Sequence, residues 1–387
     1  CIRDSLSTVR CWEAMDLYRK VLGVPGKPVA PVPVHVLSAA FVNAGAFDFE
    51  LRALDHAVND SAFLPVVATS NGASNPVPEA LVCSYNARSI GLSNGNHAAG
   101  PSPGTVDGAG RVKPELVLPF SATSWATGGA GSMAAVLRDA APAGARRPEV
   151  LKAVLLAGAT KEEFADWDKT ATRPLDEVYG AGEANLYQSF RILEGGDQEP
   201  GAAPGRGWHL LAHDGEAGSE WTFTVPPGQR GKRFSLVATW NRTLRYGPGI
   251  YEPDPLPDVN LEMVRASGVM VQESRSAVDN IEHLYLEDLQ SGTYTVRISS
   301  DLPAAVAVAW RMEFLSPPRL RFSRSGSPGI LLSGLVPGDD YVVERKCGDR
   351  DWEAVESLRA EAGEEEWSDP EPSSDARAFY RVRHLQP

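Results

Sequence analysis

A run of small residues restricts the fold of this chain more than any other feature. Residues 123–137 read TSWATGGAGSMAAVL, in which Ala, Gly and Ser hold most positions. Such side chains bury little apolar surface themselves, but they let neighbouring backbones come close in a densely packed interior. The run directly follows the extended segment KPELVLP (residues 113–119) and a Ser-Ala-Thr turn. We therefore expect a helix, beginning at Ser124, that passes through the interior of a larger domain.

Length, composition and charge exclude several classes of protein. The 387 residues exceed one ordinary core and predict two or three domains. With 43% hydrophobic and 22% charged residues, the composition is that of a globular protein. A formal charge of −13 with no basic run disfavours nucleic acid as a partner. Apolar runs such as residues 304–314 are interrupted by charge, so we expect no membrane span.

The N-terminus and the cysteines say little about cellular location. The chain begins with Cys1, and its opening residues lack the basic start and apolar centre of a signal peptide. We expect that an N-terminal part has been removed. The four cysteines, which lack metal-ligand spacing, predict no disulfide framework and leave the redox compartment open: Cys1, Cys11, Cys83 and Cys347.

Residues 31–193 alternate strand-like and helix-like segments. The runs VPVHVLSAAFV and FLPVVATS flank a segment of helical periodicity, FELRALDHAVNDS. PEALVCSYNA and RVKPELVLP are interpreted as further strands, and SWATGGAGSMAAVLRDAA and RPEVLKAVLLAGA as helices. This order of elements predicts an α/β domain with a parallel sheet over residues 1–193.

The remainder of the chain indicates all-β structure. Gly and Pro accumulate in residues 194–207, which we interpret as a linker. Residues 208–316 contain short alternating runs separated by turn signals, as in an antiparallel β-sandwich. Residues 317–387 predict a second, small β unit.

Ser124 is a candidate nucleophile because of its position at the start of a helix. Unpaired N–H groups and the helix dipole favour negative charge at such a place. The alternative is that Ser124 only caps the helix, as Ser commonly does. Asn71, in LPVVATSNGASNP, follows an apolar strand. By itself it is interpreted as a turn residue, since Asn-Gly is a frequent turn pair.

These segments resemble the subtilisin-like serine proteases. KPELVLP and ATSWATGGAG are similar to the family's nucleophile region, although Ala122 and Gly128 replace the usual Gly and Pro. LPVVATSNGASNP is similar to the strand that carries the oxyanion Asn. RRPEVLKAVLLAGAT and VYGAGEANLYQSF resemble the segments that close the domain. The resemblance covers residues 31–193 and implies a partial subtilisin-like fold, with Ser124 as nucleophile and Asn71 as oxyanion donor. Asn75 is the fallback donor, and the alternative for Asn71 is a turn residue only.

The resemblance also implies an Asp and a His, in the order Asp, His, Ser, ahead of the oxyanion Asn. Neither a DTG nor an HGTH signature occurs in the chain. His35, His56 and His97 stand in the wrong segments and are interpreted as structural or solvated, as are the acids Asp107 and Glu115. We expect the missing residues upstream of residue 1, so that this chain alone is inactive.

The C-terminal segments resemble modules of bacterial exported proteins. Residues 208–316 are similar to P-domain and pre-peptidase sandwiches, and residues 317–387 to fibronectin-like repeats, with Trp352 and Tyr380 as core aromatics. We expect no cofactor. Calcium is a candidate structural ion at residues 253–258 with Asp279, although a solvated loop is the favoured interpretation.

Two functions follow as hypotheses. The first is a secreted or cell-surface serine endopeptidase, a monomer that hydrolyses protein or peptide substrates through an acyl-enzyme on Ser124. The second is a noncatalytic pseudoprotease that serves in adhesion or carbohydrate binding through its β-sandwiches. An ordinary α/β hydrolase is disfavoured because ATSWA is not a G-x-S-x-G elbow.

Overall fold

The computed structural model describes most of the chain and divides it into two compact units. The described residues are 34–41, 48–215, 218–227, 229–247, 250–315, 318–322, 329–335, 339–348, 350–371 and 378–385. The larger unit comprises Cys1–Phe223, Phe234–Leu286 and Thr293–Met312, and the smaller one comprises Thr224–Arg233, Glu287–Gly292 and Glu313–Pro387.

A four-stranded sheet lies at the centre of the N-terminal part. Its order is β1-β2-β3-β6 and all neighbouring pairs are parallel, as predicted. The strands are β1 (Val36–Ala39), β2 (Leu64–Ala68), β3 (Arg88–Leu92) and β6 (Leu116–Leu118). Helix α2 (Asp48–Ser61) connects β1 to β2, and α3 (Thr123–Ala140) follows β6.

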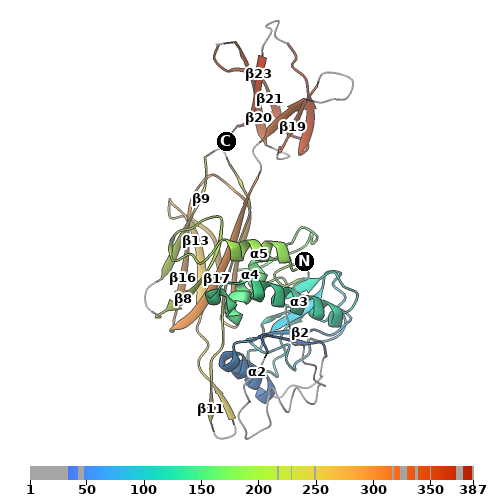
Figure 1. The fold of residues 1–387 in the computed structure, drawn as a ribbon, viewed down its shortest axis with the longest axis vertical. Helices are drawn as coiled ribbons and strands as arrows, with labels where there is room; N and C mark the ends of the chain where they lie inside the picture. Colours follow the sequence, from blue (N-terminus) through green and yellow to red (C-terminus); the bar gives the residue numbers. More distant parts are fainter. Residues whose placement is uncertain are drawn as a thin grey trace. The chain divides into compact units, whose positions relative to one another are not determined.

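The two helices cover opposite faces of this sheet (Figure 1). Successive strand residues point to opposite faces, and Val66 belongs to the buried cluster that contains α3, whereas Val67 belongs to the cluster that contains α2. Every residue of β2 and β3 is buried. Continuous burial of this kind is typical of parallel sheets with helices on both faces.

The small residues of α3 permit close packing on the face turned to the sheet, but the expectation that this helix passes through the interior is wrong, because Trp125 and Val136 on its other face are exposed. A Cβ built on Gly131 would lie 3.3 Å from the Cβ of Ser38, next to the sheet. A Cβ on Gly129 would lie 2.8 Å from the ring of Phe120. Ala126 and Ala134 are fully buried on the same helix. Larger side chains at these positions would push α3 away from β1 and from the turn before it.

The strand predicted for PEALVCSYNA is wrong. Residues 80–83 form a turn, in which the Cys83 N–H donates to Glu79 O and Leu81 has a φ of 62°. Leu81 and Val82 pack in the cluster around α2 instead of joining the sheet. The third strand is β3, formed by the next segment. The prediction rested on the apolar content of the segment. These residues are apolar because they are buried, and a buried turn has the same composition as a buried strand.

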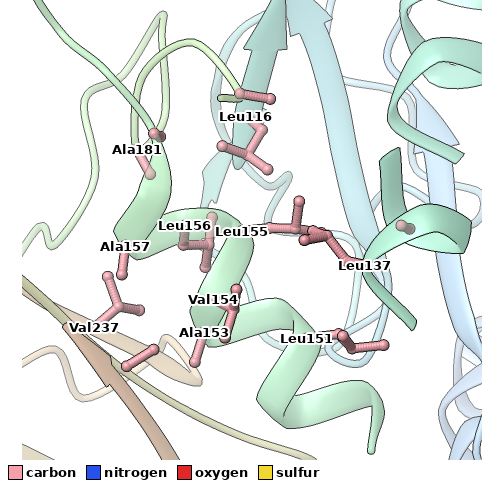
Figure 2. Close-up of a cluster of buried hydrophobic side chains, with 14 of the residues drawn as sticks. Leu116, Leu137, Leu151, Ala153, Val154, Leu155, Leu156, Ala157, Ala181 and Val237 are labelled. Carbon is pink, nitrogen blue, oxygen red and sulfur yellow. The ribbon is translucent and has the colours of Figure 1, made fainter. Parts of the chain in front are cut away.

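Helix α4 (Pro148–Gly158) joins the α/β layer to the β-sandwich. All of its residues are buried, and its apolar side chains share one cluster with the sheet residue Leu116 and with Val237 and Ala307 of the sandwich. Figure 2 shows Val237 beside the α4 residues Ala153 and Ala157. Helix α5 (Leu186–Glu194) packs against α4. The two parts of the larger unit therefore have a common core.

The sandwich has two sheets. One has the order β15-β10-β17-β8, with β8 (Arg206–His213), β10 (Gly231–Trp240), β15 (Ile281–Leu289) and β17 (Ala304–Phe314). The other has the order β14-β13-β16-β9-β7, with β7 (Gly201–Ala202), β9 (Ser219–Val225), β13 (Val259–Arg265), β14 (Met270–Ser274) and β16 (Gly292–Ser300). Buried Trp221, Trp310 and Phe223 pack together in its interior. Strand β7 and the start of β8 fall within residues 194–207.

The short remaining elements of the larger unit are two hairpin-like pairs and one turn of helix. They are β4 (Gly100–Pro101) with β5 (Val112–Lys113), β11 (Leu244–Gly247) with β12 (Ile250–Pro253), and η1 (Ala143–Arg146). Strand β12 contacts α2, where Tyr251 lies against Phe49.

The smaller unit contains two three-stranded sheets. These are β18 (Arg319–Phe322), β19 (Ile330–Ser333) and β22 (Glu364–Trp367), and β20 (Asp340–Cys347), β21 (Glu353–Arg359) and β23 (Ala378–His384). Tyr380 packs against the buried cluster of this unit. Trp352 does not belong to that cluster; it is half-buried, with the guanidinium of Arg381 at 4.3 Å from its ring centroid.

Cys83 is a buried free thiol and Cys347 is also buried, and the other two cysteines lie outside the described residues. No helix in the described ranges has the length and apolar content needed to cross a bilayer.

Candidate functional site

The two candidate residues meet where β1 and β2 end and α3 begins. Ala40 follows β1, Asn71 lies three residues beyond β2, and Ser124 is the second residue of α3. Ligand sites of parallel α/β sheets form outside the carboxyl ends of the strands, where the loops of neighbouring strands meet. The topology thus brings together residues that are far apart in sequence.

Asn71 is tied to the first residue of α3 by its side chain. Its Oδ1 accepts a hydrogen bond of 2.8 Å from the Thr123 N–H and one of 3.2 Å from the Thr123 hydroxyl. Since Oδ1 is occupied, Nδ2 projects from the other side of the carboxamide and is the group that can donate to a ligand. The amide of Asn71 and the hydroxyl-bearing residue Ser124 are therefore neighbours across the loop.

Ser124 does not cap α3. The helix begins at Thr123 and the N-cap residue is Ala122, which has extended backbone angles and provides no side-chain cap. The capping interpretation of Ser124 is thus wrong. The Ser124 hydroxyl is partly exposed and donates to the Ala40 carbonyl at 3.3 Å, so it lies at the end of β1.

The first turn of α3 provides hydrogen-bond donors beside this hydroxyl. The first four N–H groups of an α-helix have no acceptor within the helix, and Thr123 N–H is the one that Asn71 accepts. The N–H of Ser124 is the next in line and carries the positive end of the helix dipole. Together with Asn71 Nδ2, it can stabilise a negatively charged oxygen.

Asn71 directly precedes a tight turn that begins at Gly72. Gly72 has a φ of 91°, and the Asn75 N–H donates to Gly72 O at 3.1 Å. The Asn75 side-chain amide donates to the Asn71 carbonyl. Asn75 thus holds the turn together, and its amide is occupied there, which disfavours it as the fallback donor.

None of the histidines provides a base for Ser124. All seven lie in described parts of the chain, and the one hydrogen-bond partner found for the Ser124 hydroxyl is Ala40 O. His35 contacts Arg138 near the far end of α3, about 20 Å along the helix. His56 packs beside Tyr251, and His97 is buried beneath the Asn71 turn. The other four come after residue 207: His209, His213, His283 and His384.

The two acids considered as replacements form structural ion pairs. Asp107 pairs with Arg242 at 2.7 Å and with Arg52 at 3.0 Å. Glu115 is buried and pairs with Lys113 at 2.7 Å and with Lys152 at 3.5 Å. Burial raises the pKa of Glu115, but the nearby cations outweigh burial and lower this pKa to about 2.

The carboxylates suggested for calcium do not form a cluster. Asp279 is buried and accepts from the Ser276 hydroxyl at 2.9 Å, whereas Asp254 pairs with Arg245 at 3.0 Å. Within the described ranges, no three His, Cys, Asp or Glu residues are grouped in a way that could hold a metal ion.

Sequence reasoning missed two residues that shape the site. Thr123 connects Asn71 to α3, and His97 forms a backbone bridge with Asn71. The Thr before Ser124 was visible as a motif position, but only contacts reveal its partner. Nothing in the sequence indicates that His97 is linked to Asn71, because the partners of His97 are backbone groups of distant segments.

Comparisons with known proteins found distant structural neighbours. No family model matches the chain, and no curated protein matches it. Among solved structures, fervidolysin from Fervidobacterium pennivorans, a keratinolytic enzyme related to subtilisin, is similar at 13% identity and a TM-score of 0.28, over 89% of this chain and 52% of its own.

Two further neighbours differ in kind. Tripeptidyl peptidase 2 is similar at 9% identity and a TM-score of 0.26, over 81% of this chain and 38% of its own. A tandem CBM22 domain of Paenibacillus barcinonensis Xyn10C is similar at 8% identity and a TM-score of 0.16, over 46% of this chain and 72% of its own. The chain therefore spans about half the length of fervidolysin and less of tripeptidyl peptidase 2.

Proposed function

We propose that this chain is the later portion of a subtilisin-type serine endopeptidase. The observation that carries the proposal is the pair of hydrogen bonds from Thr123 to Asn71 Oδ1. They join a carboxamide to the start of a helix whose small residues pack against the sheet and whose second residue is Ser124. The sequence motifs around both residues support the same assignment.

In the proposed reaction, the Ser124 hydroxyl attacks a peptide carbonyl and forms an acyl-enzyme, which water then hydrolyses. The Ser124 N–H and Asn71 Nδ2 donate to the oxygen that becomes negatively charged. One such donor contributes roughly 3 kcal/mol to transition-state stabilisation. The hydroxyl proton passes to a histidine oriented by an aspartate, and the proposal places both upstream of residue 1, because the histidines of this chain are engaged elsewhere.

A fluorophosphonate probe tests this proposal, with the polypeptide extended upstream as its gene encodes it. We expect stoichiometric labelling of Ser124, and no labelling of Ser124→Ala. Ser132→Ala is the matched control, since Ser132 lies exposed on the same helix and its loss should leave labelling unchanged. We expect Asn71→Ala to slow labelling by about 10²- to 10³-fold. A folded, extended protein that does not label at Ser124 would falsify the proposal.

A second candidate function is noncatalytic binding through the sandwich. The observation that favours it is a hollow of about 620 Å³ lined mainly by polar residues, among them Asp258, Asn260, Glu262, Arg275 and Ser299. Retention of specific glycans on an array, together with an upstream sequence that lacks HGTH, would support it.

We propose that the endopeptidase acts as a monomer, secreted or at the cell surface, on protein or peptide substrates.

A further inference from the structure

The position of Asn71 depends on a neighbouring segment, residues 96–98. The Gly72 N–H donates to Asn96 O at 3.0 Å, and the Ala98 N–H donates to Ser70 O at 2.8 Å. These bonds form an antiparallel bridge between Asn71 and His97. Any movement of residues 96–98 would therefore move the backbone of Asn71, and with it the carboxamide that Thr123 holds.

The imidazole of His97 holds this segment in place through two hydrogen bonds. Its Nδ1 accepts the Leu92 N–H at 3.1 Å, and its Nε2 lies 2.9 Å from the Val178 carbonyl. The residue has 0% of its surface exposed. A carbonyl can only accept, so Nε2 must carry the proton, while Nδ1 must be unprotonated to accept from an N–H. One neutral tautomer satisfies both partners.

The ring of His97 lies directly against the backbone of β3. A Cβ built on Gly91 would lie 2.6 Å from His97 Nε2 and 2.7 Å from the Pro114 ring. Glycine at position 91 is thus required for the imidazole to lie against β3. The two hydrogen bonds of the ring therefore connect β3 and residue 178 to the segment that bridges Asn71.

The Val178 carbonyl is itself held in place. The Asp176 carboxylate accepts the N–H groups of Val178 at 2.9 Å and Tyr179 at 2.7 Å. Asp176 and Gly180 also exchange backbone hydrogen bonds of 3.0 Å. The acceptor for His97 is therefore a preorganised turn and not a loose loop.

Protonation of His97 would break this arrangement. A proton on Nδ1 would face the N–H of Leu92, so that two donors meet and the buried Leu92 N–H loses its acceptor. The titratable groups on the flanking segments are Asp176 and Tyr179 in the turn, and Lys113 and Glu115 on either side of Pro114, which pair with each other. Burial lowers the pKa of His97, and the hydrogen bond to the Val178 carbonyl opposes that shift.

The sign of the pH effect follows from this shift. Above the ordinary pKa of 6.5, His97 is neutral in both the closed and the open loop, and the full stability of the closed loop is present. As pH falls below that value, only the open loop binds a proton, so opening becomes easier down to the lowered pKa of the closed state.

We propose that His97 is a positioning residue for Asn71 and that it acts only as the neutral imidazole protonated at Nε2, so that acid releases Asn71 from Thr123. The imidazole does not touch the substrate. It acts through the 96–98 segment. The positioning role rests on the proposed function only in its consequence for catalysis.

Hydrogen exchange of single amides in the 387-residue chain tests the positioning directly. We expect His97→Phe to speed exchange of the Thr123 and Gly72 amides by about tenfold, the factor for one net hydrogen bond, while α4 amides keep their protection. In the wild type, the same two amides should lose protection below about pH 6.5, and this step should be absent from His97→Phe. His56→Phe is the control, because His56 is half-buried on α2 and has no link to Asn71.

Two further variants cover a failure of His97→Phe to fold. His97→Asn keeps an acceptor near Nδ1, and His97→Gln keeps a donor near Nε2, so each should lose less protection at Thr123 than His97→Phe does. Wild-type protection at Thr123 in folded variants would overturn the proposal, as would an equal loss of protection in α4 and at Thr123.

Labelling kinetics separate this proposal from the proposed function. In the upstream-extended protein, His97→Phe should slow the bond-forming step on Ser124 by about tenfold or more, without weakening probe binding. If the wild type does not label but the exchange results hold, the protease assignment fails and the positioning role stands. If the wild type and His97→Phe label at the same rate, the positioning role fails and the protease assignment stands.

Discussion

Arg311 on β17 offers a quantitative test of how the sandwich is joined to the α/β layer. Its side chain is 1% exposed, and it donates to Ala157 O and to Ala159 O, each at 3.0 Å. These carbonyls lie at the C-terminal end of α4, where a helix leaves its last acceptors without partners. A cation there also interacts favourably with the helix dipole.

Replacing Arg311 by Met keeps an apolar stem of similar length but removes the side-chain donor to Ala157 O, and it leaves Ala159 O with only the longer hydrogen bond of 3.4 Å from Lys161 Nζ. Each hydrogen bond from a charged group is worth about 1.5–3 kcal/mol, and Met regains part of this loss by apolar burial. We therefore expect Arg311→Met to lower the free energy of unfolding by roughly 3 kcal/mol. With a urea slope of about 3 kcal/mol per M, the midpoint falls by about 1 M.

Tryptophan fluorescence during urea unfolding measures this change, because Trp221, Trp240 and Trp310 are buried in the sandwich. Arg297→Met is the matched control: Arg297 is half-exposed and pairs with exposed Glu220, so its loss should cost less than about 1 kcal/mol. If Arg311→Met unfolds at the same urea concentration as Arg297→Met, the α4 carbonyls have other partners and the reasoning is refuted.

Two other predictions concern buried carboxylates. Glu115→Gln leaves Lys152 and Lys113 buried without a counter-ion and should lower the free energy of unfolding by about 3–5 kcal/mol at neutral pH. In the wild type, the stabilisation by Glu115 should be present above its ordinary pKa of 4.5 and be lost as pH falls toward about 2. Urea unfolding at a series of pH values measures this loss, and a stability that does not change with pH in this range would contradict the prediction. Burial raises the pKa of Asp279 to about 6, so the folded state binds a proton more tightly than the unfolded state and stability declines between about pH 4 and pH 6. Asp279→Asn should remove this decline, so that it stabilises the protein by about 1–3 kcal/mol more at neutral pH than near pH 4. Thermal unfolding at both pH values measures the difference. An equal effect of the substitution at both pH values would show that Asp279 does not cause the decline.

The elements of the α/β layer were largely predictable from local pattern. The helix over residues 123–140 and the strand over residues 64–68 appear close to where the sequence indicates them. The periodicity of their apolar residues is a local property, and both faces of the sheet are covered as a parallel sheet requires. The failure at residues 78–87 has a physical reason: a buried turn and a buried strand have the same apolar composition.

The sequence could place Asn71 and Ser124 as candidates, but not their relation. Each lies in a motif that can be recognised alone, and each had an ordinary alternative, a turn residue and a helix cap. For Ser124, the cap position of Ala122 removes the alternative. For Asn71, the turn is real, and the side chain in addition reaches Thr123.

The sequence by itself determined the local features: a small-residue helix after an extended segment, a chain of alternating elements followed by short β runs, and an acidic net charge. These depend on residue size, charge and spacing over a few positions. The tertiary structure alone decided which distant groups meet, namely the carboxamide of Asn71 with Thr123, the imidazole of His97 with two backbone groups, and the guanidinium of Arg311 with the end of α4. Hydrogen bonds of this kind act over about 3 Å and depend on how the strands are ordered, so no pattern along one segment can reveal them.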